Sequence, residues 1–400
     1  MKIGSMQFNR LEFAGSLGDI GTLLPLSVGM IMVNGLSAQG VFLSVGLFYL
    51  FAGFHYKITT PVQPMKTIGA YGIATAVSAD QIMAAGLLMA VLLLIIGATG
   101  LMGAIRRIVP KETVRGVQMT TGLLLLAQGI KFIAGTGRFQ DAAAKVEPYL
   151  SVQSIGPLPI GIFIGAALGL ATLFLLENRR YPAGLLVVLG GLALGLLLGG
   201  PAHLDFSDAG PAVPELLPFG FPAWADFAIV LPLLVLPQLP MTIGNAVIAN
   251  HDLAVELFNK DARRVTPKAL CLTMSAANFL AFAFGGMPMC HGAGGLAAHH
   301  RFGARTAGSN MMIGVIFVVL AVFFGQGVLD AVRLLPLSAL GVLLIFAGSQ
   351  LALTVLDMKT RKEMFVVLLM VGVSLASNLA WGFGVGVVVA HLLKSERLSI

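Results

Sequence analysis

Two stretches of the sequence combine proline, glycine and polar residues in a pattern that could bind a small anion inside a membrane. One runs from Thr59 to Gly69 (TTPVQPMKTIG) and the other from Gly285 to Leu296 (GGMPMCHGAGGL). Each contains a Pro-Met pair, Pro64-Met65 in the first and Pro288-Met289 in the second. We interpret each stretch as a short extended segment followed by a half-length helix that begins inside the bilayer. Two such broken helices in matching places of two halves are the best sequence indication of a binding site in a transporter.

The start of a half-helix favours anions, because its first backbone N–H groups have no partner and its dipole is positive there. Pro64 and Pro288 suit the first turn, where no N–H group is missed. Gly292 and Gly294 allow the backbone to approach a ligand without an intervening side chain. The alternative is a pair of ordinary kinked helices that pack through small residues.

Two charged residues inside the predicted spans are candidates for direct roles. A cation at the membrane centre costs at least about 2.5–3.5 kcal/mol and is functional by default, so Lys66 could lie beside an anionic substrate. Asp19, in the sequence GSLGDIGT at 15–22, is the clearest acid within a span and is our candidate for proton coupling. The alternatives are structural: an ion pair between Asp19 and Lys66, or a polar contact that holds the first span in place.

Further polar residues occur in the sequence PQLPMTIGN at 237–245. Gln238, Thr242 and Asn245 are spaced i, i+4 and i+7, which predicts that they share one face of a helix. Neutral donors on that face could bind an oxyanion, or they could equally be polar contacts between helices. His291 follows the second break closely and is a candidate lining residue or proton acceptor.

The histidines lack the spacing and the neighbouring carboxylates of a metal site, so we expect neither a metal nor a cofactor. The residues that we expect to bind substrate are Gln63, Met65, Lys66, Thr67, Gln238, Thr242, Asn245, His291, Gly292, Ala293 and Gly294.

The composition is that of a polytopic membrane protein. Hydrophobic residues make up 57% of the chain and charged residues only 11%, whereas soluble domains carry about 25% charged residues. The net charge of +7 would be compatible with nucleic-acid binding. However, the basic residues cluster in short segments that alternate along the chain, as the positive-inside rule requires. We therefore expect contact with membrane lipid and no nucleic-acid partner.

Fourteen spans are predicted, with both termini on the cytoplasmic side of a cell inner membrane. The acidic segment 200–222 is predicted to be external. The predicted spans are residues 13–33, 36–55, 62–76, 81–105, 112–134, 158–177, 183–199, 223–249, 267–285, 288–303, 307–325, 330–355, 363–378 and 380–394.

An internal repeat relates the two halves of the chain. Ile20-Gly21 matches Ile243-Gly244, Pro64-Met65 matches Pro288-Met289, and Val114-Arg115 matches Val332-Arg333. Seven spans separate the members of each pair. Because an odd number of spans reverses the orientation in the membrane, the halves are predicted to be inverted copies.

The segments 15–26 (GSLGDIGTLLPL), 61–66 (PVQPMK), 237–250 (PQLPMTIGNAVIAN) and 287–309 resemble the molybdate transporter family, a branch of the sulphate permease superfamily. The resemblance implies an all-α fold of 7+7 inverted repeats like that of uracil permeases. It implies a core domain of spans 1–4 and 8–11 (13–105 and 221–325) and a gate domain of spans 5–7 and 12–14 (111–199 and 328–394). It places the substrate between half-helices 3 and 10. The chain ends at Ile400, soon after the last span, so we expect no STAS domain, as in the molybdate branch.

The resulting hypothesis is a secondary active transporter, not an enzyme, that takes up molybdate by alternating access coupled to protons. Sulphate is the alternative substrate, and a nucleobase symporter or a passive anion channel are the further alternatives. Nucleobase sites on this fold generally need a carboxylate on the eighth span, where this chain has Gln238. Whether the protein forms a homodimer is left open.

Overall fold

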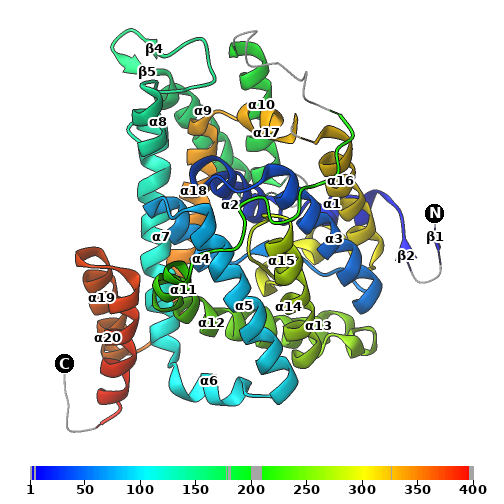
Figure 1. The fold of residues 1–400 in the computed structure, drawn as a ribbon, viewed down its shortest axis with the longest axis vertical. Coiled ribbons are helices and arrows are strands. Elements are labelled where there is room, and N and C mark those ends of the chain that lie inside the picture. Colours follow the sequence, from blue (N-terminus) through cyan, green and yellow to red (C-terminus); the bar gives the residue numbers. More distant parts are fainter. Residues whose placement is uncertain are drawn as a thin grey trace.

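The computed structural model describes residues 2–3, 6–176, 178, 182–199, 210–325 and 327–395 of the chain. Within these residues the protein is a bundle of helices with three pairs of two-residue strands (Figure 1). Helices are expected from such an apolar sequence, because every backbone polar group in a bilayer must find its partner within the protein. The predicted all-α class is confirmed. Part of the segment predicted to be external, residues 200–209, lies outside the described residues.

The first half of the chain contributes ten helices and five short strands among the described residues. The helices are α1 (Arg10–Ser16), α2 (Ile20–Asn34), α3 (Ala38–Tyr56), α4 (Lys66–Thr75), α5 (Ala79–Thr99), α6 (Met102–Ile108), α7 (Lys111–Ala134), α8 (Arg138–Ala143), α9 (Ile160–Leu175) and α10 (Ala183–Leu198). The strands are β1 (Lys2–Ile3), β2 (Met6–Gln7), β3 (Gln63–Pro64), β4 (Ser154–Ile155) and β5 (Leu158–Pro159).

The second half contains a long, irregular helical rod followed by shorter helices. The rod comprises α11 (Trp224–Val230), a π-helical segment (Leu231–Val235), α12 (Leu236–Met241), a second π-helical segment (Thr242–Ala249), α13 (Asn250–Phe258) and a 3₁₀ turn (Asn259–Arg264). It is followed by α14 (Pro267–Ala283), β6 (Met289–Cys290), α15 (Ala293–Arg301), α16 (Gly308–Phe324), α17 (Gly327–Arg333), α18 (Leu337–Ala352), a 3₁₀ turn (Leu353–Asp357), α19 (Arg361–Ala376) and α20 (Leu379–Leu392).

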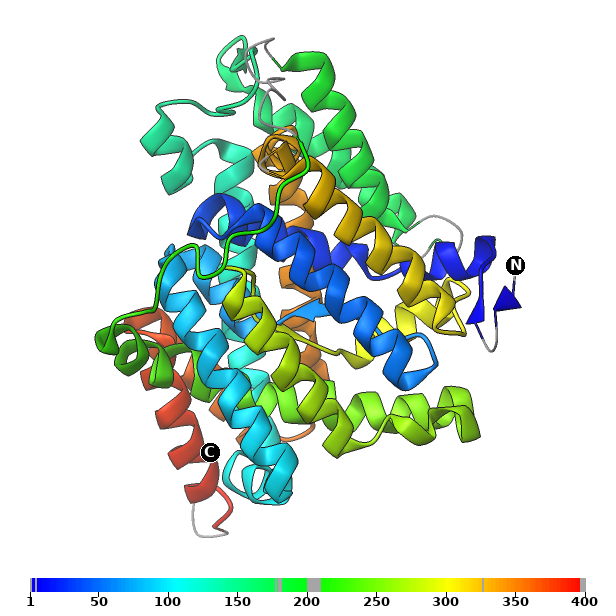
Figure 2. The same ribbon diagram turned by 45° about the vertical axis from the view of Figure 1, so that its right-hand side comes forward.

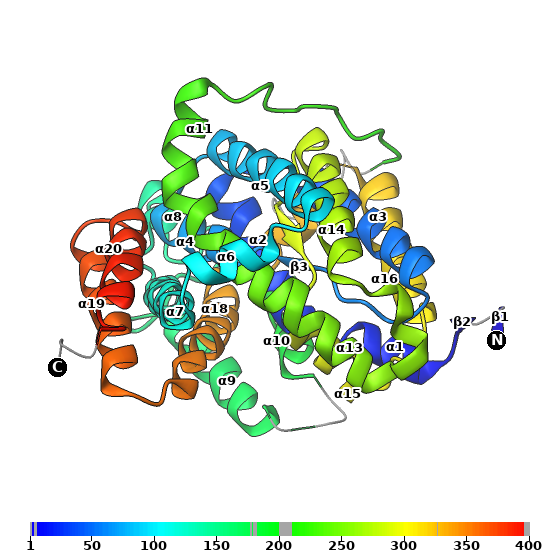
Figure 3. The same cartoon turned by 90° about the horizontal axis from the view of Figure 1, so that it is seen from below.

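The helices pack into two groups. In one group α3 packs on α16 and α5 packs on α14; in the other α7 packs on α18 and α19. Figure 3 shows α3, α5, α14 and α16 on one side of the molecule and α7, α18, α19 and α20 on the other. Figure 2 shows α3, in blue, running beside α16, in gold. Each group mixes helices from both halves of the sequence, as interlocked repeats would.

Two predicted spans have different geometry in the structure. The first span is bent by 43° between α1 and α2, so Asp19 lies at the start of α2 and not in mid-helix. Close packing accompanies the bend, since a Cβ atom on Gly18 would lie 2.9 Å from the carbonyl oxygen of Ala298 in α15. The predicted span 330–355 begins late, at Leu337. Pro336 disfavours helical backbone at the residue before it and so separates α17 from α18.

One of the three proposed repeat pairs does not occupy equivalent positions. Arg115 lies inside the second turn of α7, whereas Arg333 ends α17 and precedes α18. The Val-Arg similarity is therefore coincidental. The pair Pro64-Met65 and Pro288-Met289 does mark equivalent sites, because both precede short helices and lie side by side.

By length and composition, five helices among the described residues could cross a membrane, or up to seven if each bent pair counts as one span. Three shorter apolar helices, α9, α10 and α20, are also present in this part of the chain. Large apolar side chains on their outer faces are exposed, including Phe174 at 86% and Leu197 at 79%. Such exposure is typical of a surface that meets lipid. The protein is a multi-pass membrane protein, while the count of fourteen spans stays a prediction.

Candidate functional site

The two predicted half-helices begin beside each other in the interior of the protein. Strands β3 and β6 pair antiparallel, with Gln63 opposite Cys290 and Pro64 opposite Met289. The Met65 N–H also donates to the carbonyl oxygen of Pro288 at 2.9 Å. Helix α4 starts directly after β3, and α15 starts three residues after β6. The expectation of two interrupted segments with adjacent starts is confirmed. The strand pairing explains how extended backbone is tolerated there, because it satisfies peptide groups that water cannot reach.

Two buried asparagines hold these extended segments from outside the strand pair. Asn278 of α14 accepts from the Met289 N–H at 2.8 Å and donates to the Met289 carbonyl at 2.8 Å. Asn310 of α16 makes the same two contacts with Thr60, at 2.9 and 2.7 Å. Our reading of the sequence did not include either residue. A lone asparagine in an otherwise apolar span is the signal that could have revealed them.

The start of α4 is capped by the side chain of Gln238. Its Oε1 atom accepts from the Thr67 N–H at 2.8 Å and from the Ile68 N–H at 3.4 Å. Its Nε2 atom donates to Thr242 Oγ1 at 2.9 Å. All of these side chains are buried, as is Met65. The partial negative charge of the amide oxygen thus already occupies the positive end of this half-helix.

The start of α15, in contrast, has no side-chain cap among the described residues. Gly292 is the residue before its first turn, and the N–H groups of Ala293, Gly294 and Gly295 have no intrahelical acceptor, whereas the Leu296 N–H donates to the Gly292 carbonyl at 3.1 Å. A Cβ atom on Gly294 would meet nothing within 4 Å. The two half-helices are therefore not equivalent in this conformation, because one positive end is filled and the other is open.

A cavity of about 360 Å³ opens at this uncapped end, between the two helix groups. Its walls come from α2, α4 and α15 on one side and from α9, α10 and α18 on the other. The polar residues that line it are Asp19, Thr22, Gln63, Lys66, Thr172, Asn178, Arg301 and Gln350, and Gly294 lines it with backbone. Four of the predicted site residues, Gln63, Lys66, Gly294 and Asp19, thus meet in one cavity.

Asp19 and Gln63 form a hydrogen-bonded pair in the cavity wall. Gln63 Nε2 donates to Asp19 Oδ2 at 2.6 Å, and the Gln63 Oε1 atom is buried without a partner among the described residues. Lys66 is partly exposed and forms no ion pair with any described residue. The ammonium group of Lys66 is therefore available to an anion in the cavity.

His291 lies outside this cavity. Its side chain is fully buried, its Nδ1 atom is 2.8 Å from the Pro61 carbonyl oxygen, and its Nε2 atom is 3.3 Å from Thr273 Oγ1. One ring nitrogen thus contacts the extended segment before β3 and the other contacts α14.

Asn245 also lies apart from Gln238 and Thr242, so the expectation of a shared helical face is wrong. That expectation assumed 3.6 residues per turn, whereas residues Thr242–Ala249 are π-helical. Wider turns with i→i+5 hydrogen bonds rotate each residue less, which moves Asn245 off the common face. Asn245 lines a second cavity, between this segment and α7.

The fold and this site define a class, namely membrane carriers in which two half-helices meet at a pocket between two helix groups. Three solved structures have the same fold. SLC26A9 aligns with a TM-score of 0.66 over 96% of this chain and 65% of its own, at 15% identity. Murine Slc26a9 in the inward-facing state has a TM-score of 0.66 at 14% identity, covering 100% and 70%. The transmembrane domain of the cyanobacterial bicarbonate transporter BicA has 0.67 at 13%, covering 95% and 97%. The predicted 7+7 fold is confirmed.

Sequence comparison then gives the family. The family described as "Molybdate transporter of MFS superfamily" matches residues 11–125 and 231–351. Molybdate transporter 2 of Arabidopsis thaliana is 31% identical over 97% of this chain and 88% of its own length. Molybdate transporter 1 of Chlamydomonas reinhardtii is 28% identical, with 94% and 90% covered. The chain belongs to the molybdate transporter family. It is an anion transporter and not an enzyme.

Proposed function

We propose that the protein is a secondary active transporter for tetrahedral oxyanions, with molybdate as its principal substrate. The observation that carries this proposal is the uncapped start of α15, which opens with Lys66 onto one cavity. An oxyanion dianion offers only acceptor oxygens, and these match backbone N–H groups and an ammonium group. The names of the relatives favour molybdate. Sulphate is the second candidate because it has the same tetrahedral shape and the same charge.

In this proposal the dianion binds to the backbone of Gly292, Ala293 and Gly294 and to the Lys66 ammonium. Gln238 caps α4 from the opposite side, supported by Thr242. The Gln238 amide oxygen offsets the partial positive charge at the start of α4. Met65 and Thr67 therefore shape the site without contacting the ion in this conformation. A site that combines one open helix end and the cations Lys66 and Arg301 with the Asp19 carboxylate suits an ion that must be released again.

We name the group with α3, α5, α14 and α16, together with α2, α4, α15 and the helical rod, the core group. The group with α7, α18, α19 and α20, together with α9 and α10, is the gate group. Transport would occur as the core group moves against the gate group. The cavity supports this mechanism, because its walls belong to both groups and the anion ligands belong to the core alone. Movement of the core would then carry the bound ion from one side of the membrane to the other. The domain boundaries given above, the inner-membrane location, the cytoplasmic termini and a homodimer remain predictions.

Proton coupling through Asp19 forms part of the proposal. Moving a dianion into a negative interior costs about 2.3 kcal/mol per charge per 100 mV, so uptake needs a co-transported cation. Asp19 is the one carboxylate among the described residues that line the cavity, and it is linked to β3 through Gln63. A proton on Asp19 would enter and leave with the anion.

Uptake of radiolabelled molybdate into proteoliposomes tests the function. We expect uptake that an inward proton gradient stimulates and that excess unlabelled molybdate abolishes. Lys66→Met should reduce uptake about tenfold or more, the loss of about 1.4 kcal/mol of anion stabilisation. Lys66→Arg keeps the charge and should retain most activity. Equal activity of the Met and Arg variants would remove Lys66 from the site, and absence of molybdate uptake by the wild type would refute the function.

A further inference from the structure

A second cavity, of about 450 Å³, lies between the π-helical segment Thr242–Ala249 and the start of α7. Its polar lining consists of Lys111, Arg115, Gln118, Asn245 and Thr354, together with the backbone of Gly244. Like the first cavity, it has one wall from the core group and one from the gate group. The end of α18 separates the two, because Gln350 lines the first cavity and Thr354, one turn further on, lines the second.

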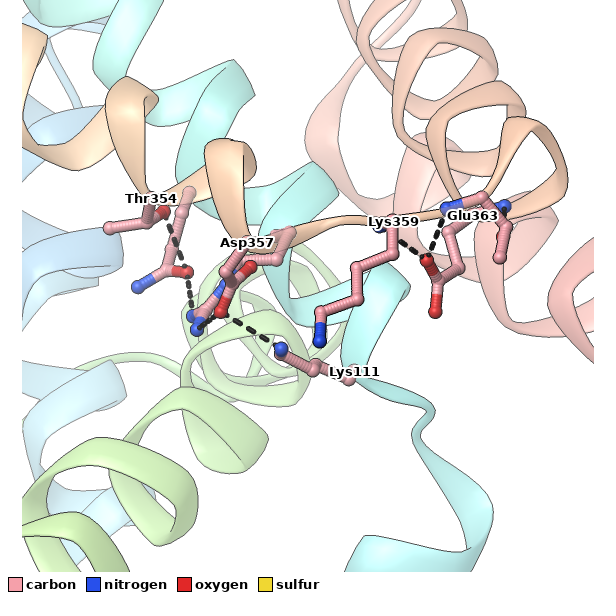
Figure 4. A network of polar contacts seen from close by, with 8 residues as sticks. Lys111, Thr354, Asp357, Lys359 and Glu363 are labelled. Carbon is pink, nitrogen blue, oxygen red and sulfur yellow. Dashed lines mark hydrogen bonds and ion pairs between the residues drawn. The ribbon is translucent and has the colours of Figure 1, made fainter.

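The charges around this cavity are unbalanced toward positive. Asp357 accepts from Arg115 Nε at 2.9 Å and Arg115 NH2 at 2.6 Å, and its Oδ2 atom is 2.9 Å from Lys111 Nζ. Figure 4 shows Lys111, Asp357 and Thr354 in this network. Two cations therefore face one carboxylate. No carboxylate lines the cavity itself in the described part of the chain.

Gln118 presents an unused donor to the cavity. Its Oε1 atom accepts from Arg115 NH1 at 2.7 Å and from Thr354 Oγ1 at 3.1 Å, which fixes the orientation of the amide. Its Nε2 atom has no acceptor among the described residues, although the residue is only 6% exposed. This N–H group is not among the fully buried unpaired atoms, so it is accessible from the cavity, where a ligand oxygen could accept its hydrogen bond. The Asn245 amide lies in the opposite wall.

We propose that this cavity is a second binding site for a small tetrahedral oxyanion, held between Gln118, Asn245 and the cations at the start of α7. The ligand is either a free inorganic oxyanion or the phosphate of a lipid headgroup, which offer the same acceptor oxygens. Because Gln118 belongs to the gate group and Asn245 to the core group, an ion bound between them links the two. Occupancy of this site then favours one conformation of the transporter. The site does not depend on which anion the first cavity carries.

Saturation binding of labelled molybdate and, separately, labelled sulphate to the purified protein in phosphatidylcholine nanodiscs tests the proposal. We expect two classes of site. Gln118→Glu has the same size and keeps the acceptor for Arg115 and Thr354, but it replaces the free N–H donor with an anionic oxygen. We expect Gln118→Glu and Asn245→Asp each to lower the affinity of one class of site for the labelled anion at least tenfold. The affinity of the other class should stay unchanged. Gly294→Val should weaken the other class. Gln81→Glu, the same change in charge in the first turn of α5, is the matched control.

The outcomes test the second site and the proposed function independently of each other. A single class that Gly294→Val weakens and Gln118→Glu does not, or two classes that Gln118→Glu leaves unchanged, overturns the second site and still supports the proposed function. If the wild-type protein instead shows a single class that Gln118→Glu weakens and Gly294→Val does not, the proposed function is overturned and the second site is supported. Adding phosphatidic acid to the nanodiscs distinguishes the sources. Displacement of the labelled ion from the Gln118-sensitive class identifies a lipid headgroup as a ligand, and no displacement identifies the free ion.

Discussion

At the scale of single residues, close packing fixes the wall of the first cavity. A Cβ atom on Gly295 would lie 2.5 Å from Asp19 Oδ2, and one on Gly292 would overlap the Gln63 amide. These two glycines therefore allow the Asp19–Gln63 pair to lie directly against α15. Gly294, between them, faces open space. Of these three glycines, two allow close contact with the Asp19–Gln63 pair and the third leaves space at the start of α15.

Gly294→Ala should impair transport without unfolding the protein. The added methyl group meets no neighbour but enters the cavity beside the free N–H groups of α15. We expect KM for molybdate uptake to rise about tenfold, equivalent to about 1.4 kcal/mol. Gly372→Ala in α19, where a Cβ atom also meets nothing within 4 Å, is the control and should behave like the wild type. Identical KM values for the two variants would show that the anion does not approach Gly294.

Asp19→Asn should separate anion movement from proton movement. The amide keeps the size of the carboxylate and can still hydrogen-bond to Gln63, but it cannot exchange a proton. We expect the stimulation of uptake by an inward proton gradient to disappear, while exchange of labelled for unlabelled molybdate at equal pH continues. The comparison is the ratio of initial rates with and without the gradient. A ratio equal to that of the wild type would rule out Asp19 as the coupling group.

At the scale of elements, the pairing of β3 with β6 depends on side chains from neighbouring helices. Asn278 satisfies both backbone groups of Met289, and Asn310 does the same for Thr60. These contacts replace the outer strands that a larger sheet would provide. Two paired two-residue strands could not otherwise persist in an apolar environment, where each unpaired peptide group costs several kcal/mol.

Asn278→Leu should destabilise the pairing of β3 with β6. It leaves the N–H and C=O groups of Met289 without partners, and each loss costs about 1–3 kcal/mol. We expect a clear drop in the melting temperature of the detergent-solubilised protein and loss of uptake. Ser275→Ala removes one hydrogen bond from the same helix to the Ala90 carbonyl and should cost only about 1 kcal/mol. Equal melting temperatures for these two variants would contradict the role given to Asn278.

The ion pair between α7 and the end of α18 gives a pH-dependent prediction outside the membrane. Arg115, followed by Lys111, lowers the pKa of Asp357 well below its ordinary value. A depressed carboxyl pKa contributes stability above the unfolded-state value near 3.8, and this contribution is lost as the pH falls through the folded-state pKa. Because the carboxylate is 41% exposed, we expect Asp357→Asn to cost at most about 1 kcal/mol at pH 7. The difference in melting temperature between wild type and variant should shrink below pH 4 and stay constant between pH 6 and 8; a difference that grows on acidification would contradict the assignment.

At the scale of the whole molecule, α2 and α10 approach each other closely at a pair of glycines. A Cβ atom on Gly184 in α10 would lie 2.5 Å from the Cα atom of Gly21 in α2. This contact lies beside the first cavity, whose lining includes both residues. When the core group moves against the gate group, Gly21 and Gly184 must therefore move past each other at a contact that is too close for any side chain.

Gly184→Ala should act as a wedge between the two groups. The new methyl group would press on backbone, which cannot rotate away, so we expect at least a tenfold fall in uptake. Gly190→Ala in the same helix meets only the end of the Leu168 side chain, at 3.3 Å, and should transport normally. Melting temperatures measured for both variants separate a blocked transporter from a misfolded one. Normal uptake by a well-folded Gly184→Ala variant would show that this contact opens freely during transport.

The sequence by itself determined the class of protein, the family and the two places where helices are interrupted. Few charges and long apolar segments require helices in a membrane, and the proline-glycine breaks near Pro64 and Pro288 require two of these helices to start in its interior. Local backbone chemistry dictates both features. For the same reason Lys66 and Asp19, the charged residues in otherwise apolar segments, were identified correctly as part of one polar region.

Only the tertiary structure decided which polar groups line the first cavity. Gln238 caps α4, His291 is used by the segment before β3, and Asn245 faces another cavity. The π-helical turns that rotate Asn245 away have no signature in the spacing of its neighbours. Contacts such as Asn278 with Met289 or Gly21 with Gly184 join residues far apart in the chain. Periodicity reports the faces of one element, whereas the partner of each face is set by how the elements pack.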